Sequence, residues 1–148
     1  MNPLLLLAPE IVLFLAGLVI FLLDLVRRNA ARTNLFQGIA LVGLIVALVA
    51  SLALLGQNTT ALTMMTVDGF ALFFKVLVII VMILVVASAG DYMHARSRHQ
   101  GEFYAMLMAA TLAMAVAVSA NNLLLIYLGM EFLSITSYVL VGFIRDDK

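Results

Sequence analysis

Five long apolar stretches alternate with short polar segments along the chain. They cover residues 3–26, 35–55, 69–89, 103–118 and 122–144. A helix that crosses a bilayer needs roughly 20 consecutive, mostly apolar residues, and each stretch is close to that length. A helix also satisfies its own backbone hydrogen bonds, as lipid requires. The pattern predicts an all-α integral membrane protein, a bundle of about five transmembrane helices in a single membrane domain over residues 1–148.

The basic residues between these stretches are distributed unevenly. If the spans alternate in direction, all of these residues fall on the same side of the membrane: Arg27, Arg28, Arg32, Arg96, Arg98, Arg145 and Lys148. Cytoplasmic loops of membrane proteins carry an excess of Lys and Arg. The sequence therefore predicts an N-terminus outside and a cytoplasmic C-terminus. The opposite loop, residues 56–68, mixes Thr and Met, which favours a segment in the plane of the interface.

The composition agrees with a multi-pass membrane protein that is embedded in the lipid bilayer. Hydrophobic residues make up 66% of the chain and charged residues 11%, and the mean hydropathy is +1.20. Soluble domains average roughly 25% charged residues. There is no cysteine, which excludes disulfides and cysteine-ligated metals or clusters. The formal net charge is zero, so nothing in the overall charge indicates nucleic-acid binding.

One acid stands near the middle of the last apolar stretch. Glu131 follows Tyr127 by four residues and precedes Ser134 by three and Tyr138 by seven. At about 3.6 residues per turn, these four polar side chains share one helix face. Such a stripe is typical of a helix that lines a hydrated path or a proton relay. The alternative is a protonated carboxyl group that serves as a helix–helix packing contact.

Lys75 is the other ionisable residue well inside a predicted span. A lysine about two turns into a helix can extend its side chain to the membrane interface. Alternatively, Lys75 is a candidate partner of Glu131, because a 1.5 Å rise per residue puts the two at depths that differ by only about 5 Å. A pair that opens and closes could gate a proton.

Two further acids lie near the ends of the first span. Glu10 follows Pro9 close to the start, where Pro9 favours a distorted first turn. We expect Glu10 to reach headgroups or the helix N-terminus. Asp24 lies near the other end, and we expect an interfacial ion pair with Arg27 or Arg28.

Small residues recur in the fourth span. Alanine occupies positions 105, 109, 113 and 117, which share one helix face. Small residues at that spacing let another helix approach closely. The link to the last span, residues 119–122, is short, and its Ser and Asn residues favour a cap on the helix that follows.

The segment from Asn121 to Phe143 resembles the fifth transmembrane helix of the antiporter-like subunits of complex I, the proton-pumping NADH:quinone oxidoreductase. Resemblance to subunit N in particular is carried by four further motifs: Gly101–Ala105 with the Ala- and Met-rich span after it, Pro9-Glu10, Asp24, and Asp68–Phe70. The chain resembles the N-terminal part of a longer subunit, which has many more spans.

This resemblance implies that Glu131 is the membrane-embedded glutamate of a proton half-channel coupled to quinone reduction. It implies no cofactor in this chain, with flavin, iron–sulfur clusters and quinone on other subunits. It also implies that the partners are other membrane subunits of complex I, including neighbouring antiporter-like subunits, in a bacterial inner (plasma) membrane. The lysine that partners the glutamate lies on a later helix in that family.

Two alternatives stay open at this point. The chain could belong to a multisubunit sodium/proton antiporter or a membrane-bound hydrogenase, which share the glutamate-bearing helix. It could also be a structural membrane piece, in which Glu131 is a packing contact and the alanine face determines assembly.

Overall fold

The computed structural model describes residues 3–26, 34–61, 63–96 and 99–143. Five of its helices are long and apolar enough to cross a membrane, which confirms the predicted all-α membrane bundle. They are α2 (Ala8–Val26), α3 (Leu35–Ala53), α4 (Gly69–Arg96), α5 (Gln100–Ser119) and α6 (Leu123–Val141). A one-turn helix, α1 (Pro3–Leu6), precedes them.

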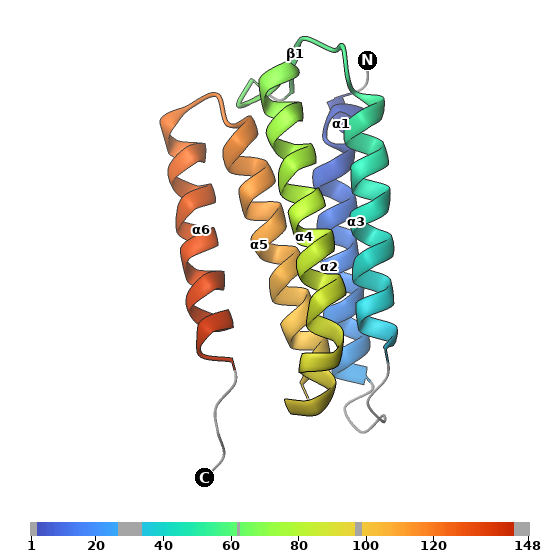
Figure 1. Ribbon diagram of the computed structural model, residues 1–148. Helices are drawn as coiled ribbons and strands as arrows, with labels where there is room; N and C mark the ends of the chain where they lie inside the picture. Colours follow the sequence, from blue (N-terminus) through green and yellow to red (C-terminus); the bar gives the residue numbers. More distant parts are fainter. Residues whose placement is uncertain (1–2, 27–33, 62, 97–98, 144–148) are drawn as a thin grey trace.

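The helices run alternately up and down, so that one end of the bundle collects the starts of α2, α4 and α6 (Figure 1). Most of the basic residues used to predict the orientation lie outside the described residues, so the orientation stays a prediction. We call the end that carries α1 and the start of α2 the hairpin end, because a two-stranded hairpin lies there. The other end is called the opposite end.

The hairpin end carries two short strands that the hydropathy pattern does not predict. β1 (Thr59–Ala61) and β2 (Met65–Val67) pair antiparallel in the segment we expected to lie in the interface plane. In β2 the side chains of Met65 and Val67 are buried, and Thr66 between them is half-buried. This period of two is the mark of a strand with one covered face. The hairpin therefore closes the end of the bundle with apolar side chains.

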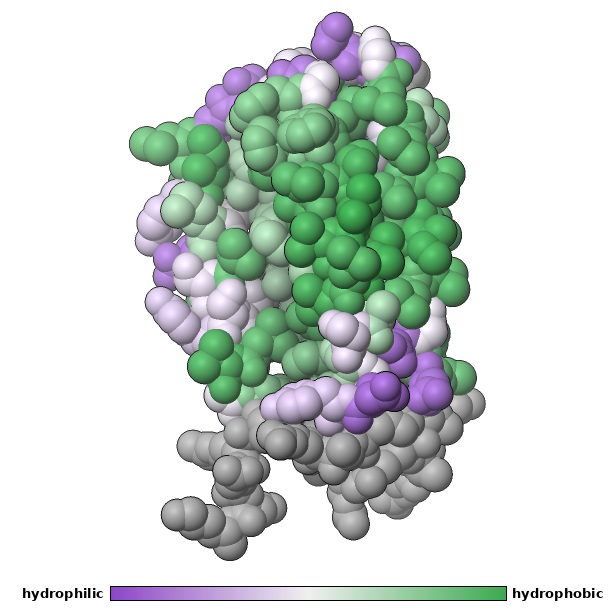
Figure 2. All heavy atoms as spheres, viewed as in Figure 1, coloured by the Kyte–Doolittle hydropathy of each residue, from purple (hydrophilic) through white to green (hydrophobic). Residues whose placement is uncertain are grey.

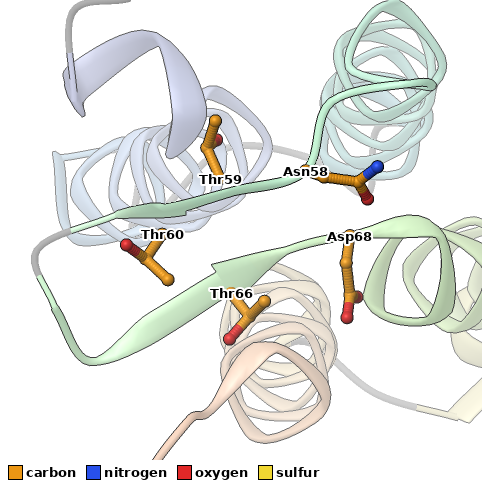
Figure 3. Close-up of a pocket in the computed structure, with 5 residues that line it drawn as sticks. All are labelled: Asn58, Thr59, Thr60, Thr66 and Asp68. Carbon is orange, nitrogen blue, oxygen red and sulfur yellow. The ribbon is translucent and has the colours of Figure 1, made fainter.

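The hairpin is joined to the turn between α5 and α6 by its backbone. Met65 forms an isolated antiparallel bridge with Ala120, and the Asn121 N–H donates to the Met64 carbonyl at 2.8 Å. Polar residues of the hairpin and of the two segments that flank it line a shallow, open depression (Figure 3): Asn58, Thr59, Thr60, Thr66 and Asp68.

Helix α5 is the centre of the bundle, because it packs against α2, α3, α4 and α6. Helix α6 packs against α5 and stands at the edge of the bundle (Figure 1). The α5–α6 contact uses the predicted alanine face, since a Cβ atom at Gly129 would lie 2.8 Å from the Cβ of Ala117 and 3.2 Å from the carbonyl oxygen of Ala113. The prediction of close packing along this face is confirmed for these two alanines.

Candidate functional site

Helix α6 begins where the sequence predicts a cap. The side-chain oxygen of Asn122 accepts a hydrogen bond from the Leu125 N–H at 2.8 Å. This satisfies one of the backbone donors that a helix leaves free in its first turn. The cap fixes the start of the helix and therefore the depth at which Glu131 lies.

The α5 contact decides which way Glu131 faces. Gly129 is buried against α5, and a residue two positions later lies about 200° further around the helix. Glu131 is accordingly exposed on the side away from α5. Tyr127 and Tyr138 are 60% and 75% exposed on the same side. Ser134 is half-buried, and its hydroxyl donates to the Met130 carbonyl at 2.9 Å.

The structure thus brings the four predicted side chains together on one outer surface. We call Tyr127, Glu131, Ser134 and Tyr138 the α6 outer face. In Figure 2, pale and purple residues lie at mid-height over α6, whereas the neighbouring face is green. Glu131 makes no ion pair with any residue that the structure describes. A charged carboxylate at the bilayer centre costs about 2.5–3.5 kcal/mol on insertion scales, unless water or an opposite charge stabilises it.

Lys75 pairs with an acid other than the one we predicted. Its ammonium nitrogen contacts Oε1 of Glu10, and the Lys75 side chain is fully buried. The predictions that Lys75 reaches the interface or pairs with Glu131 are therefore both wrong in this structure. Lys75 faces the bundle interior from α4, whereas Glu131 faces away from it.

Glu10 is likewise inside the bundle instead of at its surface. It is only 7% exposed, although we expected it to reach headgroups. The helix is interrupted at Leu7, between α1 and α2, two residues before Pro9. This distortion is the one that Pro9 predicts, because a proline ring clashes with the carbonyl four residues earlier. The interruption begins α2 with its first acid turned inward.

Asp24 lies at the opposite end of the bundle, beside the start of α5. The Asp24 carboxylate lies so close to Gly101 that a side chain there would clash with it. A carboxylate beside the first turn of a helix is favourable, because free N–H groups and the helix dipole point toward it. The arginines expected to pair with Asp24, Arg27 and Arg28, lie outside the described residues.

Ionisable side chains lie both inside the bundle, at Glu10 and Lys75, and on the surface of α6, at Glu131. Among the residues that the structure describes, no group of three or more His, Cys, Asp or Glu could hold a metal ion. The two ionisable sites differ in character: the Glu10–Lys75 pair is enclosed, and the α6 outer face is open.

Comparison with known sequences finds one kind of protein repeatedly. The chain is 37% identical over 141 residues to NADH-quinone oxidoreductase subunit N 1 of Solibacter usitatus, covering 95% of this chain and 29% of that protein. It is 39% identical over 143 residues to subunit N of an Anaeromyxobacter species (95% and 27%). It is 35% identical over 143 residues to subunit N of Heliobacterium modesticaldum (96% and 30%).

These matches confirm the resemblance to subunit N along nearly the whole chain. The chain spans less than a third of the length of the curated relatives it matches. No protein-family model matches it.

Proposed function

Because the chain is similar to subunit N of NADH-quinone oxidoreductases along nearly all of its residues, we propose that it is a membrane-arm subunit of such a complex. In this proposal the complex resides in a bacterial inner membrane and translocates protons. The chain holds no redox group, and flavin, iron–sulfur clusters and quinone belong to other subunits. Its own contribution is Glu131.

The observation that carries the proposal is the exposure of Glu131 on the α6 outer face. A carboxylate accepts a proton by forming one O–H bond and releases it by breaking the same bond, so it can serve as a stop on a proton path. The hydroxyl groups of Tyr127, Ser134 and Tyr138 extend along about 16 Å of the helix, at 1.5 Å per residue. They can both donate and accept hydrogen bonds.

The partners follow from the same surface. A carboxylate in lipid is stabilised by water or by an opposite charge on a neighbouring helix. We infer that further membrane helices of the complex cover the α6 outer face and supply a cationic partner for Glu131. The relatives' names favour an oxidoreductase over the antiporter and hydrogenase alternatives. Sodium-dependent transport without NADH oxidation would reverse that preference.

The test replaces Glu131 by glutamine in the host and isolates membrane vesicles. Glutamine keeps the size of the side chain and removes its titrating proton. We expect proton uptake and NADH:quinone reductase activity to fall together, while the amount of assembled complex is unchanged. The matched control is Glu102→Gln, because Glu102 is exposed at the opposite end of the bundle.

Three results separate the alternatives. Normal pumping in Glu131→Gln would remove Glu131 from the proton path. Loss of assembly in Ala113→Leu, with normal pumping in Glu131→Gln, would favour a structural role for the chain. Purification of the chain in mild detergent without NADH:quinone reductase activity would argue against the complex itself.

A further inference from the structure

The Glu10–Lys75 pair is an ionisable site that the proposed function does not use. It joins α2 to α4 inside the bundle, whereas Glu131 lies on the outer side of α6. Lys75 is completely enclosed and Glu10 is 7% exposed. Apart from each other, the Lys75 nitrogen and both Glu10 oxygens have no hydrogen-bond partner among the described residues.

Two apolar clusters enclose the pair along the bundle axis. Toward the hairpin end lies a small apolar cluster that we call the lid. It consists of Leu6 of α1, Leu54 just after α3, Met65 and Val67 of β2, and Leu72 of α4. On the other side the main core begins, with Leu13 one turn beyond Glu10 and Ile79 one turn beyond Lys75. The pair is therefore a polar site between a thin apolar layer and a thick one.

The thin layer consists of short elements. Glu10 lies only about 3 Å along the axis from the start of α2, at 1.5 Å per residue. Above it are the one-turn helix α1 and a β2 strand of three residues. Short elements of this kind open locally at much lower free energy than packed spans do. Water thus has its shortest route to the pair through the lid.

Enclosure without other hydrogen bonds destabilises both charges. Moving an ion out of water costs several kcal/mol, and a single contact compensates only in part. A group in this position commonly responds by becoming neutral. Within a contacting pair, such a change needs no proton from outside. If one N–H bond of the Lys75 ammonium breaks and one O–H bond forms on Glu10, an amine and a carboxylic acid result and the net charge is unchanged.

We propose that Glu10 and Lys75 form a second proton-transfer site, which alternates between an ion pair and a neutral pair, and that the lid controls its contact with water at the hairpin end. Water admitted by an open lid favours the ion pair, and the closed lid favours the neutral pair. This inference does not rest on the function proposed for Glu131.

The chain allows a direct spectroscopic test. Its only glutamates are Glu10, Glu102 and Glu131, and the last two are exposed. Glu102→Gln with Glu131→Gln therefore leaves Glu10 as the sole glutamate. With carboxyl-isotope-labelled glutamate, every shifted infrared carboxyl band of the full chain in lipid bilayers belongs to Glu10. We expect both a carboxylate band and a protonated carboxyl band. A carboxylate band alone would overturn the proton transfer.

The lid is tested in the same background by transfer into D2O. Val67→Ala removes two methyl groups from the lid, and we expect it to speed isotope exchange of the Glu10 carboxyl group by about tenfold, as a local opening equilibrium shifts. The control is Val42→Ala, since Val42 is 61% exposed on α3. Equal exchange rates in Val67→Ala and the parent would refute the lid, because the water would then reach Glu10 by another route.

Discussion

Removing one partner of the Glu10–Lys75 pair should destabilise the bundle more than removing both. Lys75→Met leaves a carboxyl group buried without its partner, and breaking a buried pair in this way costs about 3–5 kcal/mol. Glu10→Met leaves an ammonium group in the same position. The double variant fills the site with two flexible apolar side chains, and such replacements are neutral or stabilising by about 1–4 kcal/mol.

The magnitude follows from the enclosure of both groups. Lys75 is 0% exposed and Glu10 is 7% exposed, so bulk water screens neither charge when its partner is removed. Each single variant should therefore lie at least about 3 kcal/mol below the parent in stability, whereas the double variant should not lie below it, so the two losses are far from additive. At 1.4 kcal/mol per factor of ten, a loss of about 3 kcal/mol is more than about a hundredfold in the folding equilibrium constant.

The assay is reversible unfolding of the full chain by SDS in mixed micelles. Because the chain has no cysteine, a single cysteine introduced at an exposed position gives one fluorophore site, and circular dichroism reports the helix content. Single variants that unfold with the parent would refute the reasoning. So would a double variant whose loss of stability equals the sum of the two single losses.

Four further substitutions test the packing and the capping of the helices. Gly129→Ala forces a Cβ to 2.8 Å from that of Ala117 and should destabilise the chain by about 1–3 kcal/mol. An added Cβ atom at Gly38 has no neighbour within 4 Å, so Gly38→Ala should stabilise the chain by about 0.5–1 kcal/mol, since Gly weakens helices. SDS unfolding of both glycine variants measures these two changes in stability. Asn122→Ala should cost about 1 kcal/mol and speed hydrogen exchange in the first turn of α6, and unchanged exchange would contradict the cap. Gly101→Ala should displace α5 from α2, since its Cβ clashes with Asp24, and crosslinking yield between cysteines on the two helices should drop.

The features that depend on one helix at a time could be predicted from the sequence. Hydropathy gave the five spans, although α4 continues to Arg96 where the apolar stretch ends at position 89. The Asn122 cap and the shared face of Tyr127 and Glu131 follow from local spacing, and the structure confirms both as geometry. The part played by Glu131 in proton transfer stays a prediction.

The features that depend on which helices touch could not be predicted. Helix spacing predicts similar depths for Lys75 and Glu131, but it does not predict which helices are neighbours. In the structure, Lys75 of α4 points toward Glu10 of α2, and α6 stands at the edge of the bundle. The position of Glu10 near the start of the first span predicts a place at the interface. The burial of Glu10 depends on α1 and the hairpin, which cover that end. The alternation of Met65, Thr66 and Val67 was the available sign of a strand.

The backbone connection between the hairpin and the α5–α6 turn has a consequence for how this chain can vary. The bridge from Met65 to Ala120 and the bond from Asn121 to Met64 involve main-chain atoms only, so most side-chain replacements leave them intact. A change of length does not, because a shift of one residue turns the covered face of a strand outward. Inserting or deleting one residue between β1 and β2 would bring Thr66 in and Val67 out. The exposed positions of this segment can therefore vary in residue type, whereas Met65 and Val67 stay apolar and the length of the segment stays fixed.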